Sequence, residues 1–202
     1  MNTIINVGRS FGSGGGYVGQ AVAEKLGIPF YDNELISKAA QESGYSPSIF
    51  EGGEKKRSIF SVSSFFASGR MSYLDNTYMN DDVLFKAQSD VIRSIAEKGD
   101  AVIIGRCADY ILRDLPCLNV FVTGPVEYRV GRIMKSEGLT EEEAEKLIRK
   151  KDRLRETYYH YYTFGSWGSA SNYHLSLDSS ILGIEGTAQY IIEFGRKAGL
   201  VK

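Results

Sequence analysis

Residues 8–17, near the start of the chain, have the composition of a loop that binds phosphate groups. The centre of this stretch is one serine among glycines: Gly12, Ser13, Gly14, Gly15 and Gly16. Glycines let several backbone N–H groups converge on one anion, and a following helix adds partial positive charge at its N-terminus. The apolar residues 4–7 predict a buried strand before the loop, and residues 18–26 predict a helix after it. This order predicts a cradle for an anion.

The loop lacks the lysine and the hydroxyl that end a standard phosphate-binding loop. That loop has the pattern G-x-x-x-x-G-K-S/T, in which the lysine reaches the outer phosphates and the hydroxyl holds magnesium. In this chain Gly15 and Gly16 follow Gly14, and Tyr17 comes next. We therefore expect positive charge and metal ligands to come from elsewhere in the chain.

Charged residues follow three of the predicted strands. Arg9 and Arg106 come directly after two of them, and Asp32 ends a third. Ligands of parallel sheets bind at the carboxyl ends of the strands, and an arginine there can bind phosphate oxygens with two parallel hydrogen bonds. We therefore predict that Arg9 and Arg106 bind phosphate. The alternative is that Arg106 only pairs with Asp109 or Asp32, and that Arg9 is an ordinary exposed loop residue.

The whole chain alternates apolar strands with helices, which is typical of an α/β protein. We expect strands at residues 4–7, 29–31, 101–104, 118–122 and 175–177, and helices at 18–26, 34–42, 83–98, 125–136, 140–158 and 186–197. The strands are almost continuously apolar, which predicts a parallel sheet covered on both faces. A length of 202 residues fits one domain that spans residues 1–202.

Two segments of this domain are expected to cover the site. Residues 51–82 are rich in Ser, Gly, Phe and Tyr without a sustained period, which predicts a mobile insertion with one or two short helices. Residues 146–155 are strongly basic and precede a flexible stretch at 163–171. They predict a lid at 151–172 whose arginines, Arg153 and Arg155, close over phosphates. The alternative is a basic helix face that only contacts solvent.

In the order and spacing of these segments, the chain resembles the cytidylate kinase-like family of P-loop proteins, relatives of the nucleoside monophosphate kinases. The likeness covers most of the chain except roughly residues 51–82. The segments that carry it are residues 8–26, PFYD at 29–32, AVIIGRCADYIL at 101–112, VFVTGPVEYRVGR at 120–132, KDRLRETYY at 151–159 and NYHLSLD at 172–178. The resemblance implies a P-loop three-layer sandwich with a five-stranded parallel sheet, a helical insertion on the acceptor side and an arginine-bearing lid.

The resemblance also assigns roles to individual residues. It implies that Arg106 faces the phosphate of the acceptor and that Asp32 lies near the acceptor and the metal. Arg129 and Arg132 then border the base and phosphates of the nucleotide, which lies in the cradle of residues 12–16. Arg153 and Arg155 match the lid arginines. The expected ligands are ATP or another nucleoside triphosphate, a small phosphate acceptor and Mg²⁺, for which Asp32 and Ser13 are the candidate ligands in this chain.

Three functions are consistent with these features. The first is a transferase, a cytidylate-like kinase that moves phosphate from a nucleoside triphosphate to a nucleoside monophosphate or another small acceptor. The second is an ATP-binding or other nucleotide-binding P-loop protein with little or no kinase activity, because the loop lacks its lysine and hydroxyl. The third is an NAD-binding oxidoreductase, because residues 14–19 satisfy G-x-G-x-x-G and Asp32 ends the next strand.

Composition limits the partners and the location that we expect. A formal net charge of −1 argues against bulk binding to nucleic acid. Cys107 and Cys117 form no metal-type cluster in the sequence and predict free thiols in a reducing cytoplasm. No apolar run approaches the ~20 residues that span a membrane, and no signal peptide fits before the first strand. We thus expect a cytoplasmic protein that binds no membrane, and the insertion at 51–82 could supply a homodimer contact.

Overall fold

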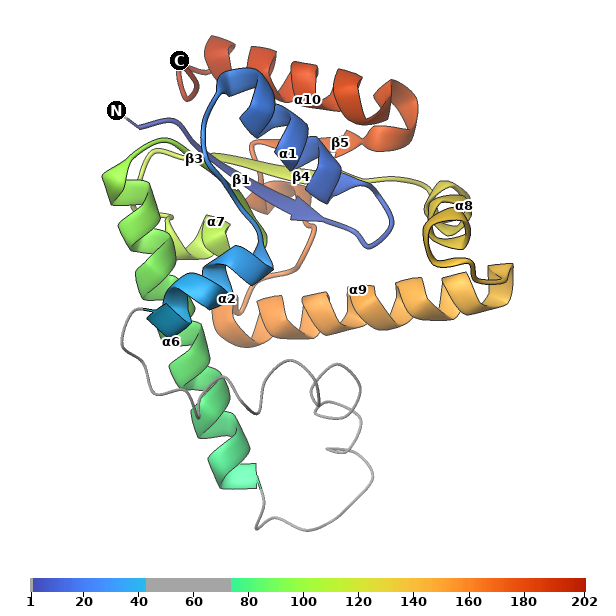
Figure 1. Ribbon diagram of the computed structural model, residues 1–202, viewed down its shortest axis with the longest axis horizontal. Helices are drawn as coiled ribbons and strands as arrows, with labels where there is room; N and C mark the ends of the chain where they lie inside the picture. The colour runs from blue at the N-terminus through green and yellow to red at the C-terminus, as the bar shows by residue number, and fades with distance from the viewer. Residues whose placement is uncertain (1, 43–73) are drawn as a thin grey trace.

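The computed structural model describes residues 2–42 and 74–202 of the chain. In these ranges, five strands form one parallel sheet in the order β2-β3-β1-β4-β5 (Figure 1). The strands are β1 (Ile4–Arg9), β2 (Phe30–Tyr31), β3 (Ala101–Ile104), β4 (Leu118–Thr123) and β5 (Leu175–Asp178). The predicted α/β class with a parallel sheet is confirmed.

Strand β1 lies in the middle of the sheet and places the glycine loop at the centre of its carboxyl edge. Val7 of β1 pairs with Ile104 of β3 on one side and with Val120 of β4 on the other. The loop after β1 therefore begins beside the segment that follows β3, which contains Arg106.

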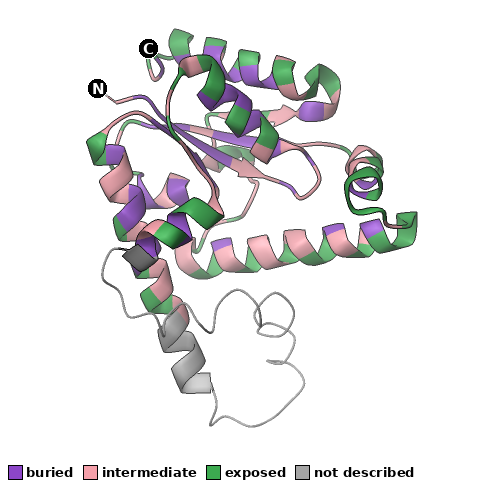
Figure 2. Ribbon diagram, viewed as in Figure 1, coloured by how far each residue is buried: buried purple, intermediate pink, exposed green. Residues whose placement is uncertain are grey.

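Helices cover both faces of the sheet (Figure 1). The helices of the described ranges are α1 (Gly15–Leu26), α2 (Asn33–Glu42), α6 (Leu74–Lys98), α7 (Ala108–Ile111), α8 (Val126–Glu137), α9 (Glu141–Thr163), the short 3₁₀ helix η1 (Ala170–Asn172) and α10 (Ser179–Lys197). Residues of α1 and α10 share one apolar core with one face of the strands, and residues of α2, α6 and α7 share a second core with the other face. Figure 2 shows the buried positions concentrated along the sheet and the inner sides of these helices. The predicted three-layer sandwich is confirmed.

Helices α8 and α9 form a helical hairpin beside the carboxyl edge of the sheet (Figure 1). A small core joins them, in which Val130 and Ile133 pack with Ala144 and Ile148. Thr140 caps the start of α9 in a capping box, because its side chain accepts from the Glu143 N–H while the Glu143 carboxylate accepts from the Thr140 N–H. The hairpin therefore has its own packing and caps, and it presents α9 to the glycine loop.

Several helices differ in extent from the sequence prediction. Helix α9 continues to Thr163, which makes the first half of the predicted lid helical. Helix α10 starts at Ser179 rather than at 186, with a break at Gly183, whose φ is +65°. Helix α7 was not predicted. Helix α6 begins at Leu74, so residues 74–82 of the predicted insertion are helical, and residues 51–73 lie outside the described ranges.

Two further observations concern location and the thiols. Among the helices in the described ranges, none is long and apolar enough to cross a membrane. Cys107 and Cys117 are both free and buried.

Candidate functional site

The glycine loop is shaped by two residues in the left-handed conformation. Gly12 has φ +81° and Gly14 has φ +79°, a region that side chains disfavour. A Cβ at Gly14 would lie 2.6 Å from Cδ1 of Ile184, and a Cβ at Gly12 would lie 3.0 Å from the Arg129 carbonyl oxygen. The loop therefore packs too closely for side chains at these positions. At Gly16 a Cβ would meet nothing within 4 Å, so the first turn of α1 is open there.

Ser13 holds the loop together from inside. Its side chain is buried, and its hydroxyl donates to the Ser10 carbonyl (2.9 Å) and accepts from the Gly15 N–H (3.3 Å). The Ser13 carbonyl in turn accepts from the Ser179 hydroxyl at 2.6 Å. The Ser13 hydroxyl thus makes two hydrogen bonds within the loop and stabilises its conformation.

The side chain of Arg9 runs along the carboxyl edge of the sheet, between two glycines. Its Cβ lies 2.5 Å from where a Cβ of Gly15 would be, and its Nη1 lies where a side chain on Gly105 would begin. No hydrogen bond or ion pair joins its guanidinium to any residue in the described ranges. Burial, and then the charges of Arg155 and Arg106, lower the pKa of Arg9 to about 9. Arg9 is therefore a cation that no described residue binds directly.

Arg106 lies beside Arg9 and is held by neutral groups. Its Nε donates to Asn33 Oδ1 at 3.1 Å, and its guanidinium carbon lies 5.8 Å from the centre of the Tyr158 ring. The expected alternative, an ion pair with Asp109 or Asp32, is absent from the described part of the chain. Asp109 instead accepts from the Tyr159 hydroxyl at 2.7 Å, and burial raises the pKa of its carboxyl.

The two lid arginines face different ways. Arg155 Nη1 donates to the Arg9 carbonyl at 3.2 Å, and its guanidinium carbon lies 5.3 Å from the centre of the Phe11 ring. Burial lowers the pKa of Arg155. Arg153 is exposed and contacts no partner among the residues that the structure describes. Two residues of the basic face before it are paired, since Lys146 and Arg149 form ion pairs with the glutamates four residues earlier. Of the two arginines in the predicted lid, Arg155 is therefore the one that lies at the loop.

Asp152, one turn before Arg155, connects α9 to the loop through hydrogen bonds. One carboxylate oxygen accepts from the Phe11 N–H at 2.6 Å, and the other accepts from Arg129 Nη1 at 2.6 Å. Arg129 also donates to the Phe11 carbonyl (3.1 Å) and to the Gly124 carbonyl (3.0 Å). The hydrogen bonds of Arg129 thus connect α8, α9 and the loop. Two of its guanidinium nitrogens, Nε and Nη1, already donate to groups of the protein.

Arg132 lies on the other side of the loop. Its Nη2 is 3.1 Å from where a Cβ of Gly14 would be. The rings of Tyr17 and Tyr128 are each centred 5.8 Å from its guanidinium carbon. Tyr17 is 63% exposed. Arg132 therefore offers a cation between two aromatic rings at the rim of the loop.

Asp32 caps helix α2 and contributes negative charge to the site. Its Oδ1 accepts from the N–H groups of Glu34 and Leu35, both at 3.0 Å. Its charge acts on Arg9 to raise the pKa of that side chain, against the larger effects that lower it. The described residues contain no group of three or more His, Cys, Asp or Glu side chains that could hold a metal.

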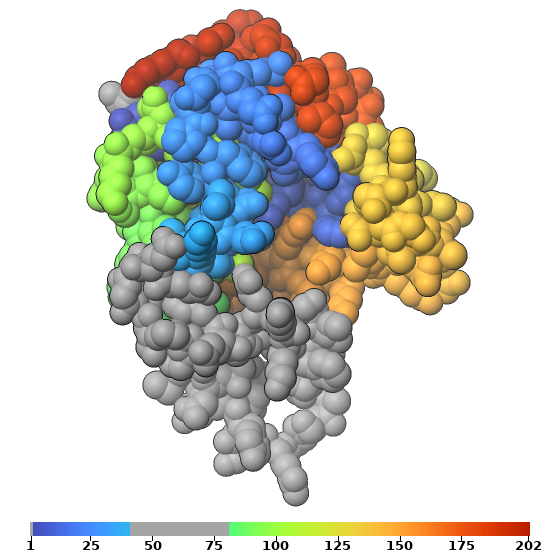
Figure 3. Space-filling view, in the orientation of Figure 1, coloured from blue at the N-terminus to red at the C-terminus, as the bar shows by residue number. Residues whose placement is uncertain are grey.

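These residues form one site at the carboxyl edge of the sheet. The structure brings Arg9, Arg106 and Arg155 together beside the glycine loop, with Asp32 nearby, and separates Arg153 from them. In the space-filling view the blue N-terminal surface meets the yellow surface of α8 and the orange surface of α9 (Figure 3). Sequence reasoning missed Asp152, although its spacing of three residues from Arg155 put both on one face of a helix.

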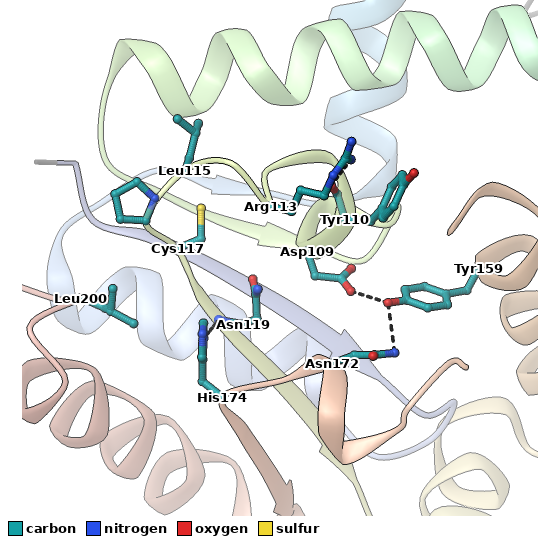
Figure 4. A pocket seen from close by; sticks show the side chains of 11 residues that line it. Asp109, Tyr110, Arg113, Leu115, Cys117, Asn119, Tyr159, Asn172, His174 and Leu200 are labelled. Carbon is teal, nitrogen blue, oxygen red and sulfur yellow. Dashed lines mark hydrogen bonds between the residues drawn. The ribbon is translucent and has the colours of Figure 1, made fainter. Parts of the chain in front are cut away.

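A cavity of about 390 Å³ lies elsewhere, and no residue predicted for the site lines it. Figure 4 shows Tyr159 reaching from α9 to Asp109 on α7 at its margin, with Asn172 also contacting the Tyr159 hydroxyl. His174 lines the same cavity, and its Nδ1 accepts from the Asn119 N–H at 3.0 Å.

The sheet order and the glycine loop define the fold of a P-loop kinase. Residues 4–181 match the model of the cytidylate kinase-like family, and the chain belongs to that family. It is 28% identical over 193 residues to a cytidylate kinase of Aeropyrum pernix, a match that covers 94% of this chain and 96% of that protein.

Solved structures show the same fold. An uncharacterized protein from Eubacterium ventriosum is similar with a TM-score of 0.70 and 27% identity, over 95% of this chain and 96% of that one. The shikimate kinase of Bacteroides thetaiotaomicron shares the fold, with a TM-score of 0.56 and 14% identity, over 97% of this chain and 99% of that one.

The topology argues against the dinucleotide alternative. In the Rossmann order 3-2-1-4-5-6, the first strand lies between the second and the fourth. Here β1 lies between β3 and β4. The match of residues 14–19 to G-x-G-x-x-G therefore reflects a glycine-rich phosphate loop in a different fold.

Proposed function

We propose that the chain is a phosphotransferase that moves the γ-phosphoryl group of ATP, or of another nucleoside triphosphate, to a nucleoside monophosphate of the cytidylate type. The observation that carries this proposal is the convergence of Arg9, Arg106 and Arg155 beside the glycine loop. Phosphoryl transfer depends mainly on positioning and on neutralising charge. Among the described residues, the ion pair of these three arginines is the one between Arg155 and Asp152, at 3.8 Å. Bound phosphates would supply further negative charge to the cluster.

The donor site is built by the loop and the start of α1. Residues 12–16 offer backbone N–H groups and the helix N-terminus to the phosphates. Arg132, with Tyr17 and Tyr128, borders the outer side of the loop, where an aromatic base can stack on a guanidinium or a ring. Arg129 acts indirectly in this proposal, because its bonds to Phe11 and Asp152 hold the loop in shape.

The acceptor site lies on the β3 side of the edge. Among the described residues, Asn33 and Tyr158 orient Arg106 and no carboxylate pairs with it, so its remaining N–H groups can bind an acceptor phosphate. The cytidylate kinase from Aeropyrum pernix supports cytidylate as the first acceptor to test. The acceptor and the donor phosphates would then meet near Arg9 and Arg155.

Asp32 fits a single magnesium ligand, whereas Ser13 does not. Mg²⁺ usually binds one or two carboxylates together with substrate phosphates and water. Asp32 uses one oxygen to cap α2, and its second carboxylate oxygen has no hydrogen bond to a described residue. The Ser13 hydroxyl is buried and already bonded within the loop. Bound Mg²⁺ would neutralise charge on the donor phosphates.

The second candidate function is a nucleotide-binding protein with little or no transfer. It is favoured by one observation: Gly15 and Gly16 provide neither the lysine nor the hydroxyl of a standard loop. The two candidates differ in turnover and not in binding.

The experiment is to measure ADP formation from ATP with a panel of acceptors, with and without Mg²⁺. The panel contains CMP, dCMP, UMP, AMP, shikimate and gluconate. The proposal predicts ADP formation that depends on CMP or dCMP and on Mg²⁺. Nucleotide binding without acceptor-dependent ADP formation would support the second candidate. Turnover with shikimate or gluconate alone would exclude the cytidylate-type acceptor.

A further inference from the structure

The position of Arg9 relative to Gly15 indicates that Arg9 takes the role that the lysine has in a standard phosphate-binding loop. We propose that the Arg9 side chain fills the space, and supplies the charge, that a lysine at position 15 supplies in a standard phosphate-binding loop. This inference rests on the proposed function in one respect, because the charge is directed at the phosphates of a nucleotide donor.

This difference from the standard loop is visible in the register of the sequence. When Gly14 is taken as the second glycine of G-x-x-x-x-G-K-S/T, the first glycine falls at position 9 and the lysine at position 15. This chain has Arg9 and Gly15 at those positions. The charged residue and the residue without a side chain have thus changed places.

The packing explains why both positions must differ together. A Cβ at position 15 would lie 2.5 Å from Cβ and 3.2 Å from Cγ of Arg9, and 3.2 Å from Cβ of Val122. The Cβ of Arg9 cannot swing away, because Arg9 is in β1 and pairs with Val122 of β4. Side chains at 9 and 15 therefore compete for one space, and Arg9 occupies it.

The far end of Arg9 lies where charge is useful for binding phosphate. Its Nη1 packs against Gly105, where a side chain would block it. The guanidinium thus lies at the carboxyl edge between β1 and β3, close enough to Arg106 and Arg155 for their charges to lower its pKa. No described residue binds it through a hydrogen bond or ion pair. An anion bound by the loop would offer it the missing partner.

The test is a double-mutant cycle with four proteins: wild type, Arg9→Gly, Gly15→Lys and the double variant. Binding of ATP is measured by calorimetry with and without Mg²⁺. We expect Arg9→Gly to weaken binding at least about tenfold, the effect of losing a charge-assisted hydrogen bond. Gly15→Lys alone should lower both the affinity and the melting temperature, because Arg9 is still present. The double variant should regain most of the affinity that Arg9→Gly loses.

Two controls are needed. The first tests whether the added positive charge must be at position 15, and the second tests the packing of Arg9 against position 15 without nucleotide. Gly16→Lys in the Arg9→Gly background places a lysine where space is open, and it should not restore affinity. Gly15→Ala should lower the melting temperature in wild type and much less in Arg9→Gly, a comparison that needs no nucleotide. These variants keep the test valid if a lysine at 15 impairs folding.

The inference is overturned if the double variant binds ATP no better than Arg9→Gly, or if Gly15→Ala is equally tolerated in both backgrounds. It is also overturned if Arg9→Gly keeps full affinity and full transfer, a result that would leave the proposed function intact. An intact binding cycle in a protein that transfers phosphate to no acceptor would instead refute the proposed function alone.

Discussion

The Asp152 carboxylate on α9 accepts a hydrogen bond from the Arg129 guanidinium on α8 at 2.6 Å, and both side chains are largely shielded from solvent. The same carboxylate accepts from the Phe11 N–H in the glycine loop. One acidic side chain therefore connects the helical hairpin with the loop that we propose binds the donor phosphates. The shape of the loop depends on the lid helix as well as on its own glycines.

Asp152→Asn should destabilise the fold measurably. The amide can still accept from Phe11 but loses the ion pair, and a hydrogen bond to a charged group contributes about 1.5–3 kcal/mol. The side chains of Arg129 and Asp152 are 11% and 19% exposed, so solvent screens this pair little. We expect the free energy of unfolding in urea to fall by about 2 kcal/mol.

Glu142→Gln is the matched control for Asp152→Asn. Glu142 pairs with Lys146 on the same helix, but their side chains are 77% and 65% exposed. Exposed pairs of this spacing contribute about 0.3–0.5 kcal/mol. Equal losses from the two variants would contradict the connecting role of Asp152.

Arg106→Ala should weaken acceptor binding while the protein stays folded. Arg106 is half-buried, and its side-chain hydrogen bonds in the described part of the chain join it to neutral groups, Asn33 and Tyr158. Loss of a charge-assisted contact to phosphate predicts at least about tenfold weaker CMP binding. Calorimetric titration with CMP, with circular dichroism as the folding check, measures this. Unchanged affinity would assign Arg106 a purely structural role.

The affinity for ATP should fall as the pH rises above about 9. The pKa of Arg9 is lowered to about 9 in the free protein by burial and by Arg155 and Arg106, and bound phosphate favours the charged form. ATP therefore binds with proton uptake at high pH. Calorimetry at pH 8 and pH 10, in two buffers of different ionisation enthalpy, measures the affinity and the uptake.

Stability should change in the opposite direction over the same pH range. In the unfolded chain the pKa of Arg9 has its ordinary, higher value, whereas burial and the charges of Arg155 and Arg106 lower it to about 9 in the folded chain. The unfolded state then binds more protons, and this group's contribution to the free energy of unfolding rises with pH. Arg9→Gly should remove both effects, and pH effects that persist in this variant would refute their assignment to Arg9.

Tyr159→Phe should destabilise the end of α9. The Tyr159 hydroxyl donates to the Asp109 carboxylate, whose pKa is raised by burial. Without this donor, a buried carboxylate loses a partner, at a cost of about 1–3 kcal/mol. Tyr190→Phe, at an exposed ring on α10, is the comparison. Thermal unfolding of both variants should separate them, and equal melting temperatures would show that the Asp109 contact contributes nothing.

Local patterns in the sequence predicted the parts of the site that depend on neighbours along the chain. Glycines after an apolar run indicated the loop, and Arg106 after a buried strand was placed at the sheet edge. The contact of Asp152 with Arg129 was not predicted, because it depends on how α8 packs against α9. The start of α10 was missed because Gly183 interrupts its helical period. The competition of side chains at positions 9 and 15 for one space was not predicted either, because it depends on how closely β1 and α1 approach each other.

The most direct test of the central claim is transfer of label from γ-labelled ATP to CMP in the presence of Mg²⁺. The wild-type protein should form labelled CDP, and Arg106→Ala should form little or none while remaining folded. Formation of no labelled product from CMP or any other acceptor of the panel, by a wild-type protein that binds ATP, would contradict the claim that this chain is a phosphotransferase.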